Sequence, residues 1–199
     1  MEDRRAIERM LEAYFERYPD ERPRLEHFAD FVRSFDGRDL YDRKNFVGHI
    51  TAAAFVVDRR RKSVLLLEHR QLGKWLQPGG HVEASDASVF DAALREVHEE
   101  TGIGPERLEL LERSADGEAS PSDADAHRIP ACGRKNEDGH WHFDLRFAFL
   151  FDGDPGVSVD RSESLGYRWA TLGELEAMPD FGRIARRLAA ALDRLDRSR

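Results

Sequence analysis

Cysteine is almost absent from this sequence, in which Cys132 is the only one among 199 residues. A single cysteine cannot form an internal disulfide, so a reducing compartment is the expected location. Long hydrophobic runs are also lacking, because no apolar stretch approaches the roughly 18 residues of a transmembrane helix. The first ten residues are highly charged and contain no apolar segment typical of a secretory signal. These absences predict a cytoplasmic protein that does not enter a membrane.

An excess of basic residues is lacking as well, since the formal net charge at pH 7 is −8. Without a basic stripe, no surface is expected to neutralise the phosphate backbone of an extended nucleic acid. An acidic protein that acts on a phosphorylated compound would need a cation to offset the repulsion. The hydrophobic content of 40% is enough for one substantial core.

The most informative stretch spans residues 75–103 and reads WLQPGGHVEASDASVFDAALREVHEETGI. Its second half has apolar residues at helical spacing, which predicts an amphipathic helix. Ser85 or Asp86 is the expected N-cap of this helix. Gly102 is placed to end it, and Pro105 prevents its continuation.

Three glutamates fall on one face of this predicted helix. Glu96, Glu99 and Glu100 occupy positions i, i+3 and i+4, so their like charges repel one another. Most acidic triplets on helices are simply solvated, but a divalent cation with a preference for oxygen ligands would explain this one. The Pro-Gly-Gly segment at 78–80 lets backbone groups approach a ligand closely. Arg95 can reach Glu99 one turn later and hold that carboxylate in place.

The same stretch resembles the Nudix box, whose pattern is Gly-x5-Glu-x7-Arg-Glu-apolar-x-Glu-Glu-x-Gly-apolar. The second half fits at every specified position, namely Arg95, Glu96, Val97, Glu99, Glu100, Gly102 and Ile103. The first half departs from the pattern, because eight residues and not seven separate Asp86 from Arg95. Either Asp86 takes the role of the early acid across a one-residue insertion, or that role is missing.

The resemblance to Nudix hydrolases (MutT-like proteins) covers roughly residues 46–180 and implies their fold and chemistry. The fold would be an α/β/α sandwich with a mixed sheet. The reaction would be hydrolysis of a diphosphate bond, typically in a nucleoside diphosphate linked to another group. The residues implied to hold Mg²⁺ or Mn²⁺ are Gly79, Glu96, Glu99 and Glu100. Glu99 or Glu100 could act as the base, with Arg95 beside them. Glu163, in the loop before a later strand, is the candidate for a base outside the box, unless it is only a solvated loop acid.

Other functions of the same fold are less consistent with the residues. A Nudix-like sensor or scaffold without catalysis would be marked by loss of the box carboxylates, and all three helix acids are present. Isoprenoid diphosphate isomerases rely on a reactive cysteine, whereas Cys132 lies in no matching motif. RNA decapping is disfavoured by the acidic charge. A small-molecule diphosphate is therefore the expected partner, and a homodimer is compatible with the sequence.

Periodicity predicts the remaining elements. We expect helices at 4–18, 25–35 and 181–195, strands at 49–57, 63–67, 108–111, 140–151 and 161–169, and a short helix opened by a Thr171–Glu174 capping box. The polar segment 114–130 is expected to be a long loop. We divide the chain into an N-terminal helical extension, residues 1–45, and a Nudix hydrolase domain, residues 46–199. The extension would dock on the catalytic domain, on another subunit, or over the substrate site as a lid.

The strand expected at 140–151 has two different faces. Its aromatic face belongs to the core, and its other face carries His140, His142, Asp144 and Arg146. That second face could be an exposed or internally paired polar surface. It could also be a substrate wall, in which Arg146 grips a phosphate and His142 or Asp144 hydrogen-bonds the leaving group. A transition-metal site fits less well, because alternate residues on one strand lie about 7 Å apart. His81 of the box loop is a further candidate for substrate binding.

Overall fold

The protein was analysed as a computed structural model that describes residues 3–35, 37–131, 138–153 and 156–197. The helices are α1 (Arg4–Arg17), α2 (Glu26–Ser34), α3 (Val89–Thr101), α4 (Leu172–Ala177) and α5 (Gly182–Arg197). The strands are β1 (Gly48–Asp58), β2 (Ser63–His69), β3 (Lys74–Leu76), β4 (Gly79–His81), β5 (Leu108–Leu110), β6 (Asp123–Ile129), β7 (His140–Phe151) and β8 (Ser164–Thr171). Short 3-10 helices lie at Pro19–Glu21, Gly37–Leu40 and Pro105–Arg107.

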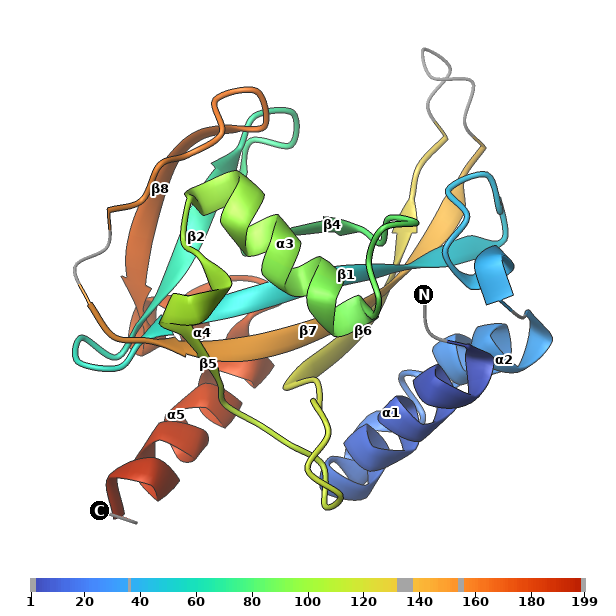
Figure 1. Cartoon of the computed structure of the whole chain (residues 1–199), viewed down its shortest axis with the longest axis horizontal. Helices are drawn as coiled ribbons and strands as arrows, with labels where there is room; N and C mark the ends of the chain where they lie inside the picture. Colours follow the sequence, from blue (N-terminus) through green and yellow to red (C-terminus); the bar gives the residue numbers. More distant parts are fainter. Residues whose placement is uncertain (1–2, 36, 132–137, 154–155, 198–199) are drawn as a thin grey trace.

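All eight strands belong to one mixed sheet built around a parallel pair. The main path runs β3-β2-β1-β7-β5, while β4 pairs with β1, β6 with β7 and β8 with β2. β1 and β7 are parallel along their whole length, and the other pairs are antiparallel. α3 and α5 cover opposite faces of the sheet, and Figure 1 shows α3 above the central strands and α5 below them. The predicted α/β/α sandwich with a mixed sheet is therefore confirmed.

The alternation of side chains along β1 and β7 creates two cores. On one face, Ala52 and Ala54 of β1 are small enough for α3 to approach, and Phe147 of β7 packs edge-on against Phe90 of α3. On the other face, Phe55 and other apolar residues of the same strands contact α5. Both central strands are buried along almost their entire length, as expected for parallel strands covered on two sides.

The N-terminal helices pack on the same chain. The rings of Phe28 and Phe31 of α2 lie 5.0 and 4.4 Å from the ring of Phe143 in β7. At the other end of the pair, Tyr14 of α1 accepts a hydrogen bond from Arg187 of α5 at 2.7 Å. Of the alternatives considered from the sequence, docking on the sheet is the one observed. The division of the chain at residue 45 stays a prediction, because these helices share the core of the sheet.

One sequence-based element is wrong and the others are close. The segment expected to be a loop at 114–130 contains β6, in which Asp123 and Asp125 bind Arg146 of β7. The capping box at Thr171 and Glu174 is confirmed at the start of α4. Within the described ranges, no helix has the length and apolar character needed to cross a membrane. Cys132 lies outside the described residues.

The stacking of α2 on the sheet predicts that the extension contributes to global stability. Phe31→Ala should lower the free energy of unfolding by about 3–5 kcal/mol, because it removes a buried ring against Phe143. The matched control is Phe46→Ala, since Phe46 is 40% exposed and should cost far less. Urea denaturation followed by circular dichroism measures both. Equal costs for the two variants would contradict cooperative docking of α2.

Candidate active site

The glycines of the box form β4, which lies beside the middle of β1. Gly79 pairs with Ala53, and Gly80 pairs with Ala52. A Cβ atom on Gly79 would lie 2.6 Å from the Cβ of Ala53, and one on Gly80 would lie 2.5 Å from Oε1 of Glu96. The backbone and Cβ of β1 leave no room for a side chain at Gly79, and the lack of one at Gly80 lets the Glu96 carboxylate lie directly against the β4 backbone.

Three carboxylates of α3 gather next to this backbone. Glu100 is 8% exposed and accepts a hydrogen bond from the N–H of Gly79 at 2.9 Å. The side chain of Glu96 is 12% exposed, whereas that of Glu99 is 55% exposed. The structure therefore brings together all four expected metal ligands, with two carboxylates buried and one open to solvent.

The guanidinium of Arg95 connects this group to the preceding loop. Its Nη1 donates to Glu96 Oε1 at 3.0 Å and to Glu99 Oε2 at 2.9 Å. Its Nε and Nη2 donate to the two oxygens of Asp86, each at 3.0 Å, and Nη2 also donates to the carbonyl of His81 at 2.8 Å. Asp86 thus anchors Arg95 across the one-residue insertion, which supports the first of the two sequence alternatives. Burial raises the pKa of Asp86, but its hydrogen bonds and the charge of Arg95 together outweigh burial and hold this pKa below its usual range.

The N-cap of α3 differs from the sequence expectation. The helix is capped by Ser88, whose Oγ accepts a hydrogen bond from the N–H of Asp91 at 3.0 Å. Neither Ser85 nor Asp86 takes this role, because the Asp86 carboxylate is bound by Arg95 and by the N–H of Glu83. Gly102 ends the helix as expected, in a left-handed conformation with φ of 70°.

Two of the helix carboxylates are buried without full charge compensation. Burial raises the pKa of Glu100 to about 8, although the N–H of Gly79 opposes the shift. Burial also raises the pKa of Glu96 to about 7, against the effect of Arg95. A raised carboxyl pKa means that the surrounding protein groups do not stabilise the ionised form. A divalent cation bound by oxygen ligands would supply the missing positive charge, so this donor set fits Mg²⁺ or Mn²⁺.

A loop before β8 brings further negative charge to the same place. Burial is the main cause that raises the pKa values of Glu96 and Glu100, and the negative charge of Glu163 contributes to both shifts. The loop is attached to the helix by its backbone, because the N–H of Asp160 donates to the carbonyl of Glu100 at 3.1 Å. The sequence candidate for an outside base therefore lies close enough to the carboxylate group to act on it electrostatically.

Arg146 lies on the face of β7 opposite the aromatic side chains that α3 covers. It is 9% exposed, and its Nε, Nη1 and Nη2 donate to Asp144, Asp123 and Asp125 at 3.0, 3.2 and 3.0 Å. Asp144 also accepts from the hydroxyl of Thr51 at 2.5 Å. Because every guanidinium nitrogen has a carboxylate partner, the structure favours the internally paired alternative over a phosphate-gripping Arg146. The sequence analysis missed Asp123 and Asp125 because it placed them in a loop.

His81 and His142 lie together with a third histidine that the sequence analysis did not single out. Their ring centroids are 5.3 Å apart, and the ring of His49 lies 5.1 Å from His81 and 4.7 Å from His142. Burial lowers the pKa values of His49 and His142 to about 3, and the neighbouring histidines act in the same direction. Both rings are therefore neutral at neutral pH.

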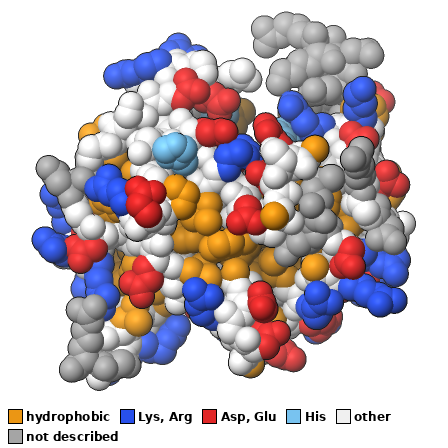
Figure 2. Space-filling view, viewed as in Figure 1, with side chains coloured by type: hydrophobic (Ala, Val, Ile, Leu, Met, Phe, Trp, Pro, Cys, Tyr) orange, Lys and Arg blue, Asp and Glu red, His pale blue; other side chains and the backbone are white. Residues whose placement is uncertain are grey.

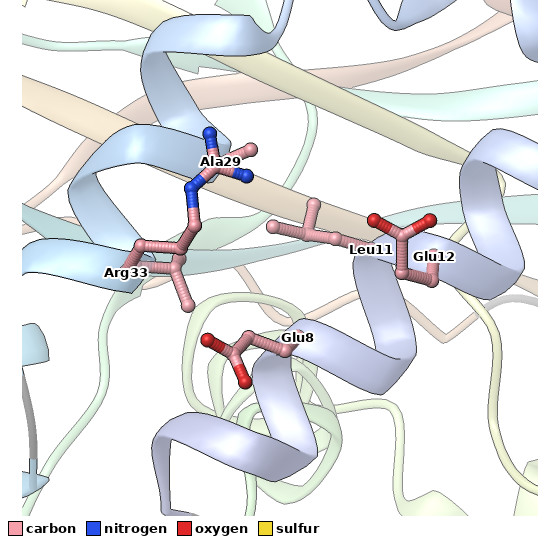
Figure 3. Close-up of a pocket in the computed structure, with 6 residues that line it drawn as sticks. Glu8, Leu11, Glu12, Ala29 and Arg33 are labelled. Atoms are coloured by element: carbon pink, nitrogen blue, oxygen red, sulfur yellow. The ribbon is translucent and has the colours of Figure 1, made fainter.

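The surface agrees with a site at α3. Figure 2 shows acidic side chains gathered near the top of the view, beside the upper end of α3, with a basic side chain next to them. A pocket of about 240 Å³ lies elsewhere, between α1 and α2, and is lined by Glu8, Leu11, Glu12, Ala29, Val32 and Arg33 (Figure 3). Its charged groups already have partners, such as Arg22 for Glu12 and Asp30 for Arg33. The α3 carboxylates, and not this pocket, define the candidate site.

Comparison with known proteins identifies the family of this chain. The family model described as the NUDIX domain matches residues 48–192. The chain belongs to the Nudix family.

Individual relatives match over part of their length. A "Probable DHNTP pyrophosphohydrolase" of Lactococcus lactis subsp. cremoris is 33% identical over 98 residues, which cover 49% of this chain and 51% of that protein. An "Uncharacterized Nudix hydrolase NudL" of Enterobacter sp. is 35% identical over 94 residues, with coverage of 41% and 46%. The chain thus spans about half the length of these curated relatives. The structure of the E. coli dihydroneopterin triphosphate pyrophosphohydrolase superposes with a TM-score of 0.54 at 18% identity and covers 73% of this chain and 95% of that one, a likeness of fold.

The contacts of the box loop predict different costs for three neighbouring substitutions. Asp86→Ala should lower the free energy of unfolding by about 3 kcal/mol, because it leaves the Arg95 guanidinium without its bidentate partner. Ser88→Ala should cost about 1 kcal/mol through loss of the helix cap. Ser85→Ala is the control, since Ser85 is exposed and should be nearly neutral. Chemical denaturation compares the three, and a larger cost for Ser85 than for Ser88 would refute the cap assignment.

Proposed function

We propose that this protein is a Mg²⁺- or Mn²⁺-dependent hydrolase of a diphosphate bond, acting on a nucleoside diphosphate linked to another group. The observation that carries the proposal is the group of Glu96, Glu99 and Glu100 around the Gly79–Gly80 backbone. Two of these carboxylates are buried with raised pKa values, which is costly unless a cation binds there.

The residues of this group would divide the work. Glu96, Glu99 and Glu100, with the Gly79 carbonyl as a further candidate, would hold the ion. The bound ion would neutralise phosphate charge and ease the loss of a proton from the attacking water. Arg95 would position Glu96 and Glu99 through its two hydrogen bonds from Nη1. Glu163 is our candidate for the base that takes the proton of the water, because its charge already acts on Glu96 and Glu100.

Among the residues expected to bind the substrate, His81 and His142 are better supported than Asp144 and Arg146. His81 belongs to β4, and its carbonyl is bound by Arg95, so its backbone lies next to the proposed reaction centre, while its ring lies with those of His49 and His142. His142 is its neighbour. Asp144 and Arg146 are paired with each other and buried, so in this proposal they only support the strand that carries His142.

The substrate class follows from the family and from the names of relatives. Compounds that contain a diphosphate bond are the group to screen, and dihydroneopterin triphosphate is included because it occurs in the names of two similar proteins. Nucleoside diphosphate sugars and dinucleoside polyphosphates complete the set. Release of phosphate or nucleotide in the presence of Mg²⁺ identifies the substrate. A homodimer stays a prediction.

Loss of one ligand charge should abolish turnover without loss of the fold. Glu99→Gln and Glu100→Gln should each lower kcat by orders of magnitude in the presence of Mg²⁺, because each removes a charged oxygen donor from the proposed metal site. Glu109→Gln is the matched control, since Glu109 is an exposed glutamate in β5. Steady-state kinetics on the substrate found in the screen measures the three variants. Near-normal turnover in either site variant would refute the metal-dependent mechanism. Absence of turnover by the parent protein on every compound of the screen would favour a binding protein without catalysis.

The role of Glu163 predicts a separate kinetic signature. Glu163→Gln should lower kcat by about 10²–10⁴-fold, as expected for loss of a general base. The Mg²⁺ concentration that gives half-maximal activity should change little, because the three helix ligands remain. Neighbouring Ser162→Ala serves as the control for the loop. A Glu163→Gln variant with unchanged kcat would return Glu163 to the role of a solvated acid.

A further inference from the structure

Three histidines from two strands converge on the side of the sheet opposite α3. His49 of β1 pairs with His142 of β7 in the parallel register, and His140 precedes His142 by one alternation on the same face. One ring nitrogen from each of the three lies within 4.8 Å of those of the other two. The sequence argument against a metal considered one strand alone, and the pairing with β1 supplies the ligand that β7 could not.

The spacing of these rings fits a transition-metal ion. Nε2 of His140 and Nε2 of His142 are 3.3 Å apart. Two nitrogens bound to tetrahedral Zn²⁺ at the usual bond length are separated by about 3.3 Å, so this pair already has the required distance. The ring of His49 lies 5.0 Å from that of His140 and 4.7 Å from that of His142, and those two rings are 5.2 Å apart. Rings around one such ion have centroids about 5 Å apart.

The tautomer of His140 also supports a metal site. Its Nδ1 lies 2.8 Å from the carbonyl oxygen of Asp138. A carbonyl can only accept, so Nδ1 carries a proton, and in the neutral ring Nε2 is the nitrogen with a lone pair, 3.3 Å from Nε2 of His142. Metal-binding histidines commonly use the second nitrogen in this way, to donate to a backbone carbonyl that fixes the ring.

His49 is the residue that most needs a ligand. It is 1% exposed, and neither ring nitrogen has a hydrogen bond of good geometry to another described residue. The Asn45 backbone lies near enough to favour the protonated ring slightly, but burial and the neighbouring histidines outweigh it. A buried polar ring without a partner costs stability, whereas a neutral imidazole is the form that binds a metal. An ion at the centre of the cluster would satisfy the lone pair.

We propose that His49, His140 and His142 bind one Zn²⁺ ion or a similar borderline transition metal. Three protein ligands leave a fourth position for a water or a substrate group, as in zinc sites that exchange ligands. His81 lies beside this position, 5.1 Å from His49 by ring centroids. The site is chemically distinct from the α3 carboxylates, because nitrogen donors select Zn²⁺ or Co²⁺ and oxygen donors select Mg²⁺. It is also spatially distinct, since His49 lies four residues, about 13 Å, along β1 from the Ala53 partner of Gly79.

Cobalt provides the test, because tetrahedral Co²⁺ has strong visible absorption. The full-length protein is titrated with Co²⁺ in excess Mg²⁺, in a Glu99→Gln, Glu100→Gln background that weakens the carboxylate site. We expect one Co²⁺ per chain with the tetrahedral spectrum, displaced by an equivalent of Zn²⁺. His49→Gln and His142→Gln should each abolish the absorption. His127→Gln should retain it, because His127 is a nearby histidine that pairs with Asp125 and lies outside the three ligands.

Each outcome decides the proposal. Circular dichroism and the thermal midpoint without metal establish that the variants are folded. Two ligand variants are used so that, if one of them fails to fold, the other still tests the site. Loss of absorption in a folded His49 or His142 variant, with retention in the His127 variant, supports the site. Absence of a tetrahedral spectrum in the parent protein, or equal binding by all variants, overturns it. Since the readout is metal binding and not turnover, failure here leaves the hydrolase proposal untouched.

Discussion

The hydrogen bonds of Arg95 are the interaction on which the candidate site depends. One guanidinium binds the Asp86 carboxylate, two glutamates of its own helix and the carbonyl of His81. Without it, the acids of α3 would repel one another and the loop after β4 would have no fixed position. The same contacts absorb the one-residue insertion, because the loop can bulge as long as Asp86 reaches the arginine. A departure from the family pattern is therefore compatible with an ordered box.

Local patterns predicted the helix and the glycine segment on which this half of the candidate site is built. The spacing of Glu96, Glu99 and Glu100 defines a helix face, and Gly79 and Gly80 can be recognised as the point where a backbone must approach it. What the pattern could not give is burial, since the sequence does not say which carboxylates turn inward. Glu100 is almost enclosed whereas Glu99 is largely exposed, and this difference creates the uncompensated charge. The N-cap was misplaced for a related reason, because the partner of Asp86 lies nine residues away on the helix.

Local sequence patterns could not predict β6 or the histidine cluster. β6 has the composition of a loop, and it is a strand because Asp123 and Asp125 are paired with Arg146 across the ladder. The histidine cluster depends in the same way on which strand lies beside β7. His49 is unremarkable in its own segment, and only the register with His142 gives it chemical meaning. The docking of α2 is similar, since its apolar face could be recognised but not its target on Phe143.

The two-faced character of β7 has a consequence for how the chain folds. Large aromatic side chains occupy one face of the strand, and histidines, an aspartate and an arginine occupy the start of the other. A shift of one residue against β1 would turn the charged side chains into the aromatic core and the rings toward the ion pairs of the other face, so the correct register is strongly selected. Its partner strand β1 lies far away in the sequence, and the segment between them contains the whole box. Pairing of β1 with β7 must close that segment, so we expect this ladder to form late in folding and the aromatic face of β7 to stay uncovered until then.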